Sequence, residues 1–137
     1  MSNPLTTYEG AELGSEICRG SFELSQSEID RFCALMGYDD PAYRAGAAGG
    51  AVAPTSMCLA FGLRLGWEAQ VFPPGVIRVG DENTYGAPAR AGDVLTTTLV
   101  ITDRFERKGR RFLTYQMVTT NPRGEQVAQV RFTAILP

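Results

Sequence analysis

The segment Gly37 to Tyr43, with the sequence GYDDPAY, holds the side chains best suited to chemistry, because two carboxylates and two phenols meet there in a polar, turn-rich stretch. The chain contains no histidine, the side chain used most often for proton transfer near neutral pH. Acid-base chemistry must therefore use carboxylates, tyrosines or cysteines, or residues of a second chain. The catalytic candidates in this loop are Tyr38, Asp39, Asp40 and Tyr43.

Each of these candidates has two interpretations. A general base at Asp39 or Asp40 would need burial to raise its pKa, whereas an aspartate just before Pro41 is also typical of a turn. Tyr38 and Tyr43 either donate hydrogen bonds into a pocket or pack as amphipathic side chains. The residues alone leave both interpretations open.

A second candidate lies at Pro54, Thr55 and Ser56, which precede an apolar helix expected over residues 57–68. Backbone N–H groups at a helix start can polarise a carbonyl or bind an anion. The hydroxyl of Thr55 or Ser56 could instead cap the helix. The helix has little polar face, so we expect it to be mostly buried, with four large side chains in the core: Met57, Phe61, Leu65 and Trp67.

Composition excludes several classes of function. A net charge of -2 gives no electrostatic case for binding nucleic acid or an anionic membrane. The three cysteines, Cys18, Cys33 and Cys58, have no C-x-x-C spacing and predict neither a disulfide framework nor a zinc site. We therefore expect no metal and no cofactor. No signal peptide or membrane-spanning run is predicted, so a cytoplasmic location is expected.

The remaining pattern predicts one α+β domain over residues 15–137, after a loose lead-in over residues 1–14. A strand over residues 15–24 precedes a capping box at Ser25 and Glu28, which begins an amphipathic helix that Gly37 ends.

The second half of the chain is predicted to be β-sheet. Four strands are expected over residues 76–85, 94–105, 112–120 and 127–136, and the last three form an antiparallel meander. Polar residues at 81–83 suggest that the first of these strands lies at an edge, an interface or a pocket rim.

Four short motifs occur in a characteristic order: Phe22-Glu23-Leu24-Ser25, Gly37 to Tyr43, Ala53-Pro54-Thr55 and Arg90-Ala91-Gly92-Asp93. With the order of elements, they make residues 15–136 resemble the MaoC-like hydratase and dehydratase family. That resemblance implies a hot-dog fold, in which an antiparallel sheet wraps one long central helix.

Active members of that family carry G-D-x-N-P-x-H in the loop. Gly37 and Pro41 keep the pattern, but the positions of the Asp, Asn and His are held by Tyr38, Asp40 and Tyr43. The chain is therefore most similar to the amino-terminal-type MaoC domain of heterodimeric hydroxyacyl-thioester dehydratases. The resemblance implies a partner subunit that supplies histidine.

The implied activity is that of a hydro-lyase subunit, an (R)-specific enoyl-thioester hydratase or 3-hydroxyacyl-thioester dehydratase of fatty acid or polyketide metabolism. Its substrates would be acyl-CoA or acyl-carrier-protein thioesters. The expected binding residues are Ala53, Pro54, Thr55, Ser56, Met57 and Phe61. One alternative is a homodimeric isomerase or cyclase that uses Asp39, Asp40 or Tyr43 on a polyketide-like substrate. Another is a non-catalytic acyl-binding module.

Overall fold

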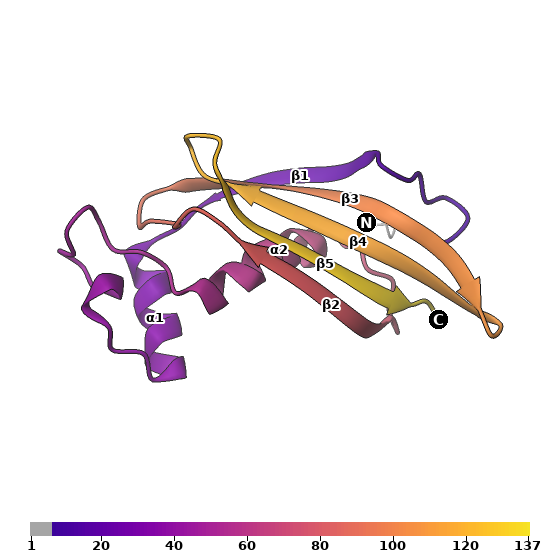
Figure 1. Cartoon of the computed structure of the whole chain (residues 1–137), viewed down its shortest axis with the longest axis horizontal. Coiled ribbons are helices and arrows are strands. Elements are labelled where there is room, and N and C mark those ends of the chain that lie inside the picture. The colour runs from indigo at the N-terminus through magenta and orange to yellow at the C-terminus, as the bar shows by residue number, and fades with distance from the viewer. Residues whose placement is uncertain (1–6) are drawn as a thin grey trace.

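The computed structural model describes residues 7–137, which form one antiparallel sheet with helices on one side and at one end (Figure 1). The order of strands across the sheet is β1-β3-β4-β5-β2. The elements are β1 (Glu16–Glu23), α1 (Gln26–Met36), the short 3₁₀ helix η1 (Pro41–Tyr43), α2 (Thr55–Glu68), β2 (Ile77–Tyr85), β3 (Val94–Arg107), β4 (Arg110–Thr120) and β5 (Gln126–Ile135). The predicted α+β class is confirmed.

The predicted boundaries of α1 are confirmed because they depend on local chemistry. The Ser25 hydroxyl accepts a hydrogen bond from the backbone N–H of Glu28 at 3.0 Å, and the Glu28 carboxylate accepts one from the N–H of Ser25 at 3.2 Å. At the other end Gly37 takes the left-handed conformation, with φ of 74°. This geometry ends the helix just before the loop that carries the catalytic candidates.

Replacing Ser25 with alanine should lower the free energy of unfolding by about 1 kcal/mol, because the N–H of Glu28 loses its acceptor. Ser27 lies one residue inside the same helix, is exposed, and serves as the matched control. Urea unfolding of Ser25→Ala and Ser27→Ala measures the difference. Equal stability of the two variants would contradict a contribution from the capping box.

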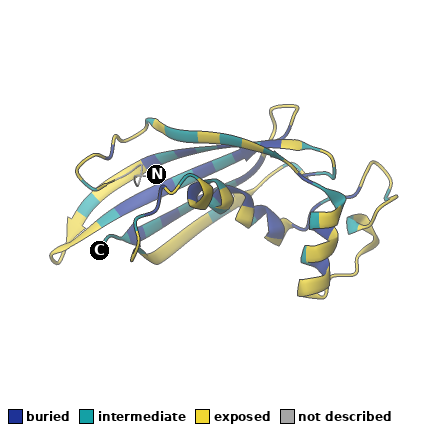
Figure 2. Cartoon of the chain, turned by 180° about the vertical axis from the view of Figure 1, so that it is seen from behind, coloured by how far each residue is buried: buried dark blue, intermediate teal, exposed yellow. Residues whose placement is uncertain are grey.

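The core lies between α2 and the face of the sheet that α2 crosses (Figure 2). Alternate residues of β3 point toward it and are buried: Leu95, Thr97, Leu99 and Ile101. Two glycines let the helix approach closely. A Cβ atom on Gly62 would lie 2.6 Å from Cβ of Met117, and one on Gly66 would lie 2.3 Å from the ring of Phe72.

The expectation that α2 is mostly buried is wrong for its outer side. Met57 and Phe61 are buried, but Ala60, Arg64 and Trp67 are exposed, and Trp67 is 63% exposed. The reason is that the single sheet covers only one side of the helix. The outer side of α2 therefore remains open to solvent.

Residues 7–14, expected to be part of a loose lead-in, instead pack against the sheet. Ala11 is 7% exposed and belongs to the main core, and Leu13 forms a parallel bridge with Ile101. The Arg104 guanidinium donates hydrogen bonds to the carbonyl groups of Tyr8 and Ala11. Residues 1–6 of the expected lead-in lie outside the described residues.

β2 lies at an edge of the sheet, as its polar residues predicted (Figure 2). It pairs only with β5, and eight of its nine residues are exposed. Ile77 and Val79 are about half exposed on this edge, at 56% and 49%. Within residues 7–137, no helix has the length and apolar character needed to span a membrane.

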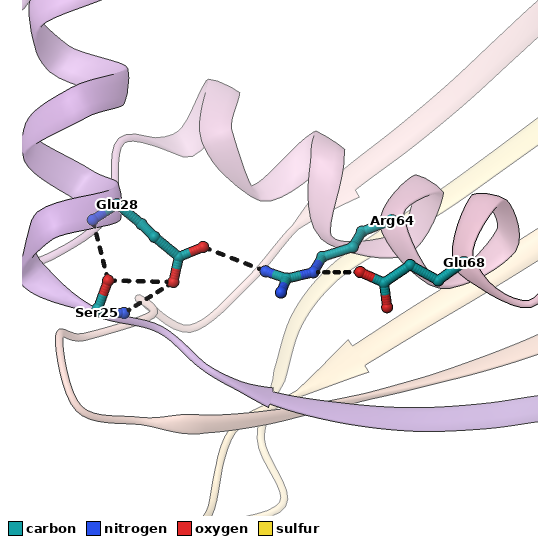
Figure 3. Close-up of polar contacts among 4 residues, drawn as sticks. All are labelled: Ser25, Glu28, Arg64 and Glu68. Atoms are coloured by element: carbon teal, nitrogen blue, oxygen red, sulfur yellow. Dashed lines mark hydrogen bonds and ion pairs between the residues drawn. The ribbon is translucent and has the colours of Figure 1, made fainter.

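Arg64 connects the two helices that flank the candidate loop (Figure 3). Its guanidinium pairs with Glu28 of the α1 capping box at 3.2 Å and with Glu68 of α2 at 3.0 Å. The same group lies over the ring of Phe22, 4.3 Å from its centroid. The start of α1 and the middle of α2 are thereby joined through one side chain.

Candidate functional site

The loop between α1 and α2 is shaped by hydrogen bonds from its own backbone. The Asp40 carboxylate accepts from the N–H of Ala42 at 2.9 Å and begins η1, so the turn interpretation of Asp40 is confirmed. The carbonyl of Tyr43 accepts from the Gln26 side chain at 3.0 Å, and the N–H of Val52 donates back to Ala42 at 2.9 Å. These bonds fold the loop back across the start of α1.

The end of the loop is joined to a distant segment, which fixes where α2 begins. The N–H of Ala53 donates to the carbonyl of Ala89 at 2.8 Å, and the N–H of Ala91 donates to Ala51 at 2.9 Å. Pro54 then precedes the first helical residue, Thr55.

Of the two interpretations of Thr55 and Ser56, side-chain capping is not found, because no side chain caps the N-terminus of α2. Thr55 is already helical, and the Ser56 hydroxyl contacts the Tyr38 hydroxyl at 3.1 Å instead. No acceptor among residues 7–137 takes the backbone N–H of Thr55 or Ser56. The positive end of the helix is therefore open to a ligand.

A cavity of about 350 Å³ lies at this open helix end. It is enclosed by η1, the end of the loop, the first turn of α2, the end of β2 and the start of β5. The lining residues are Asp40, Ala42, Tyr43, Val52, Ala53, Thr55, Cys58, Tyr85, Gly86, Ala87, Pro88 and Val127.

Two of the four catalytic candidates line the cavity, namely Asp40 and Tyr43. Asp39 is exposed outside it, and its carbonyl accepts from Arg44 at 2.8 Å. Tyr38 is 36% exposed, and its ring centroid lies 6.2 Å from that of Tyr43. Tyr38 and Tyr43 are therefore neighbours.

The expected binding residues also fall into two groups, those that line the cavity and those that do not. Ala53 and Thr55 line the cavity, while Ser56 is exposed beside it. Met57 and Phe61, at 8% and 4% exposure, belong to the core beneath the helix. Pro54 is buried at the helix start.

Cys58 is the only cysteine that lines this cavity, and its environment keeps the thiol protonated. Burial raises the pKa of Cys58 to about 11, and the thiol donates to the carbonyl of Pro54 at 3.7 Å. At neutral pH it is a small apolar side chain rather than a nucleophile. Across residues 7–137 no group of three histidine, cysteine or carboxylate side chains is placed to hold a metal ion.

The site can thus bind a ligand and polarise its carbonyl group, but it contains few side chains that could transfer a proton. The open N–H groups of α2 can stabilise negative charge on an oxygen. Asp40 already shares a carboxylate oxygen with a backbone N–H, and Tyr43 is a phenol. No imidazole exists in the chain to act as base near neutral pH.

Sequence reasoning missed the wall formed by the end of β2 and the start of β5. Gly86 donates to the carbonyl of Val127 at 2.9 Å, and Ala87 donates to Gln126 at 2.8 Å. A Cβ atom on Gly86 would lie 2.3 Å from the carbonyl oxygen of Gln126, so only glycine fits here. Glycine and proline at positions 86 and 88 are typical of a bend, but nothing near them in the sequence indicates the partner strand.

A five-stranded antiparallel sheet with a long helix across one face, and a pocket at the start of that helix, define a hot-dog domain. The sequence profile of the "FAS1-like, dehydratase domain region" family matches residues 11–130. The chain therefore belongs to this family of dehydratase domains, and the resemblance to MaoC-like proteins is confirmed. No curated protein sequence matches it significantly.

Solved structures confirm the fold. The MaoC-like dehydratase from Rhodospirillum rubrum is 22% identical, with a TM-score of 0.79 over 93% of this chain and 94% of that one. The (R)-hydratase PhaJ1 from Pseudomonas aeruginosa is 20% identical, with a TM-score of 0.78 over 95% and 84%. The HadBC complex, a 3R-hydroxyacyl-ACP dehydratase from Mycobacterium tuberculosis, contains a chain that is 24% identical, with a TM-score of 0.67 over 85% and 90%.

Proposed function

We propose that this chain is a subunit of an (R)-specific enoyl-thioester hydratase or 3-hydroxyacyl-thioester dehydratase. A MaoC-like partner would supply the acid-base residues. The observation that carries the proposal is an open helix N-terminus at a cavity lined by Tyr43. Tyr38, at the other position where the family resemblance places an acid-base residue, lies beside Tyr43 and outside the cavity lining. This chain would bind the acyl group and polarise the thioester carbonyl.

The division of labour follows from the chemistry of hydration. A base removes a proton from water as its oxygen adds to the β-carbon, and an acid delivers a proton to the α-carbon. Negative charge that develops on the thioester oxygen would be stabilised by the N–H of Thr55 at the start of α2. The exposed edge β2 and the outer side of α2 offer surface for the partner, and the HadBC and ChsH1-ChsH2 structures are complexes of two different chains.

The test compares the purified chain with the chain bound to a partner that contains G-D-x-N-P-x-H. Crotonyl-CoA hydration by the chain alone should be slower by about 100-fold or more, because general acid-base catalysis contributes at least that much. A partner whose histidine is replaced by alanine should return the complex to the low rate. Fast turnover by the chain alone would contradict the partner requirement.

A second candidate function is favoured by the positions of Asp40 and Tyr43, which both line the cavity. In a homodimeric isomerase or cyclase these two groups would transfer protons themselves, with Asp39 outside the cavity as a weaker candidate. Asp40→Asn and Tyr43→Phe should each abolish such an activity on a polyketide-like thioester. Retained activity in both variants would exclude it.

A further inference from the structure

The backbone of Arg90 is held by two hydrogen bonds in the turn that this residue begins. The Asp93 carboxylate accepts from the N–H of Arg90 at 3.0 Å, and the N–H of Asp93 donates to the carbonyl of Arg90 at 3.0 Å. The side chain then reaches the loop before α2, where Nη1 donates to the carbonyl groups of Gly49 and Gly50, each at 3.0 Å.

Among residues 7–137 the Arg90 guanidinium forms no ion pair with a carboxylate. In the described part of the chain, the ion pairs involve Arg19, Arg64, Arg78, Arg111, Arg123 and Arg131. Arg90 is half-buried, whereas the other arginines outside these pairs are exposed. A guanidinium has five N–H donors, and both bonds to the loop come from Nη1 alone. Its remaining donors can still bind an anion.

Arg90 lines a second hollow, of about 390 Å³, on the outer side of the loop. Its other lining residues are uncharged and mostly small: Pro41, Ala42, Ala47, Ala48, Gly50 and Val52. Ala42 and Val52 also line the cavity at the start of α2, so the two hollows adjoin. Asp40, which precedes Pro41 of this hollow, lines only the other cavity and accepts from the N–H of Ala42. Asp93 accepts from the backbone N–H of Arg90 and does not line the hollow.

We propose that Arg90 binds the phosphate of a phosphopantetheine arm, the group that joins an acyl thioester to coenzyme A or to an acyl carrier protein. This inference rests on the proposed function, since it takes the acyl group to lie in the adjoining cavity. The small side chains leave room for the arm, and the guanidinium provides the charge and the paired donors that phosphate oxygens accept.

A purely structural role for Arg90 would be to hold the carbonyl groups of Gly49 and Gly50. The two roles differ in what a substitution changes. Arg90→Met removes the charge and the two bonds to the loop but keeps most of the apolar stem, so it should weaken ligands that carry the phosphate more than ligands that lack it. If Arg90 only shaped the loop, the same variant would weaken ligands with and without phosphate equally.

The experiment measures dissociation constants of 4′-phosphopantetheine and pantetheine for the chain, alone and in complex with its partner, by calorimetry or NMR titration. The phosphorylated ligand should bind about tenfold more tightly, as expected for a hydrogen-bonded charge pair. Arg90→Met should abolish this preference, so that the two ligands bind with the same dissociation constant. Arg44→Met is the control, because Arg44 is an exposed arginine of the same loop that lines neither hollow.

Equal binding of the two ligands by the unaltered chain would overturn the proposal, as would an equal loss of both in Arg90→Met. Comparing a CoA thioester with an acyl-carrier-protein thioester identifies the source of the phosphate. If Arg90→Met loses binding of either thioester, the result supports the phosphate site. If it loses binding of neither, the proposed site is overturned. Because binding requires no turnover, a phosphate preference in a partner complex that does not hydrate an enoyl-CoA would reject the enzymatic function and keep the site.

Discussion

Replacing Thr55 with proline should lower kcat of the assembled enzyme by about 100-fold or more, the usual cost of losing one donor to a developing oxyanion. Thr55 is the first residue of α2, where proline is well tolerated, so the change deletes one N–H and keeps the helix. Pro54 has φ of -56° and ψ of 143°, a conformation compatible with a following proline. Hydration of an enoyl-CoA by the complex is the measurement.

Thr55→Ala is the matched control, because it removes the hydroxyl and retains the backbone N–H. This variant should keep kcat close to that of the unaltered complex. An unchanged thermal midpoint for both variants would show that the fold is intact. Full activity of Thr55→Pro would exclude the N–H of Thr55 as the carbonyl-polarising group, and an equal loss in both variants would assign the effect to the side chain.

Replacing Gly66 with alanine should lower the free energy of unfolding by about 2 kcal/mol, despite the better helix propensity of alanine. The new Cβ atom would lie 2.3 Å from the ring of Phe72. That ring cannot easily move, because it is 6% exposed and packs against Tyr115 and Phe132 at centroid distances of 5.0 and 5.3 Å. Urea unfolding should show a lower midpoint with an unchanged slope.

Gly80→Ala is the control for this prediction, since no atom lies within 4 Å of a Cβ built at Gly80. Its stability should be close to that of the unaltered protein. A smaller side chain at position 72 offers a second check. In a double variant with Gly66→Ala, Phe72→Leu should relieve part of the clash. Strictly additive effects of the two substitutions would contradict a direct contact.

The parts of the fold that the sequence predicted are those with local causes. Ser25 and Glu28 satisfy each other's backbone groups within one turn, and Gly37 supplies the conformation that ends the helix. The meander of β3, β4 and β5 follows from alternating apolar residues and short turns. These interactions join residues that are close in the chain, so the local residue types are enough to predict the element.

The parts that it did not predict depend on contacts between distant residues. The cavity wall at Tyr85 exists because β2 pairs with β5, and nothing near Tyr85 in the chain indicates this partner. The bonds from Arg90 to Gly49 and Gly50 span 41 and 40 residues. The exposure of Trp67 depends on how much of α2 one sheet can cover. Apolar composition alone could not distinguish a core position from a surface position.

The strand order also determines when the protein can fold during its synthesis. β2 is made directly after α2, yet within residues 7–137 its only partner is β5, the last strand that the structure describes. The ribosome therefore releases an apolar helix and an unpaired strand several seconds before the strand that covers both, at a rate of about 5–20 residues per second. A nascent chain that ends before β5 leaves β2 unpaired and β4 without one neighbour. Productive folding of the sheet therefore waits until β5 has left the ribosome.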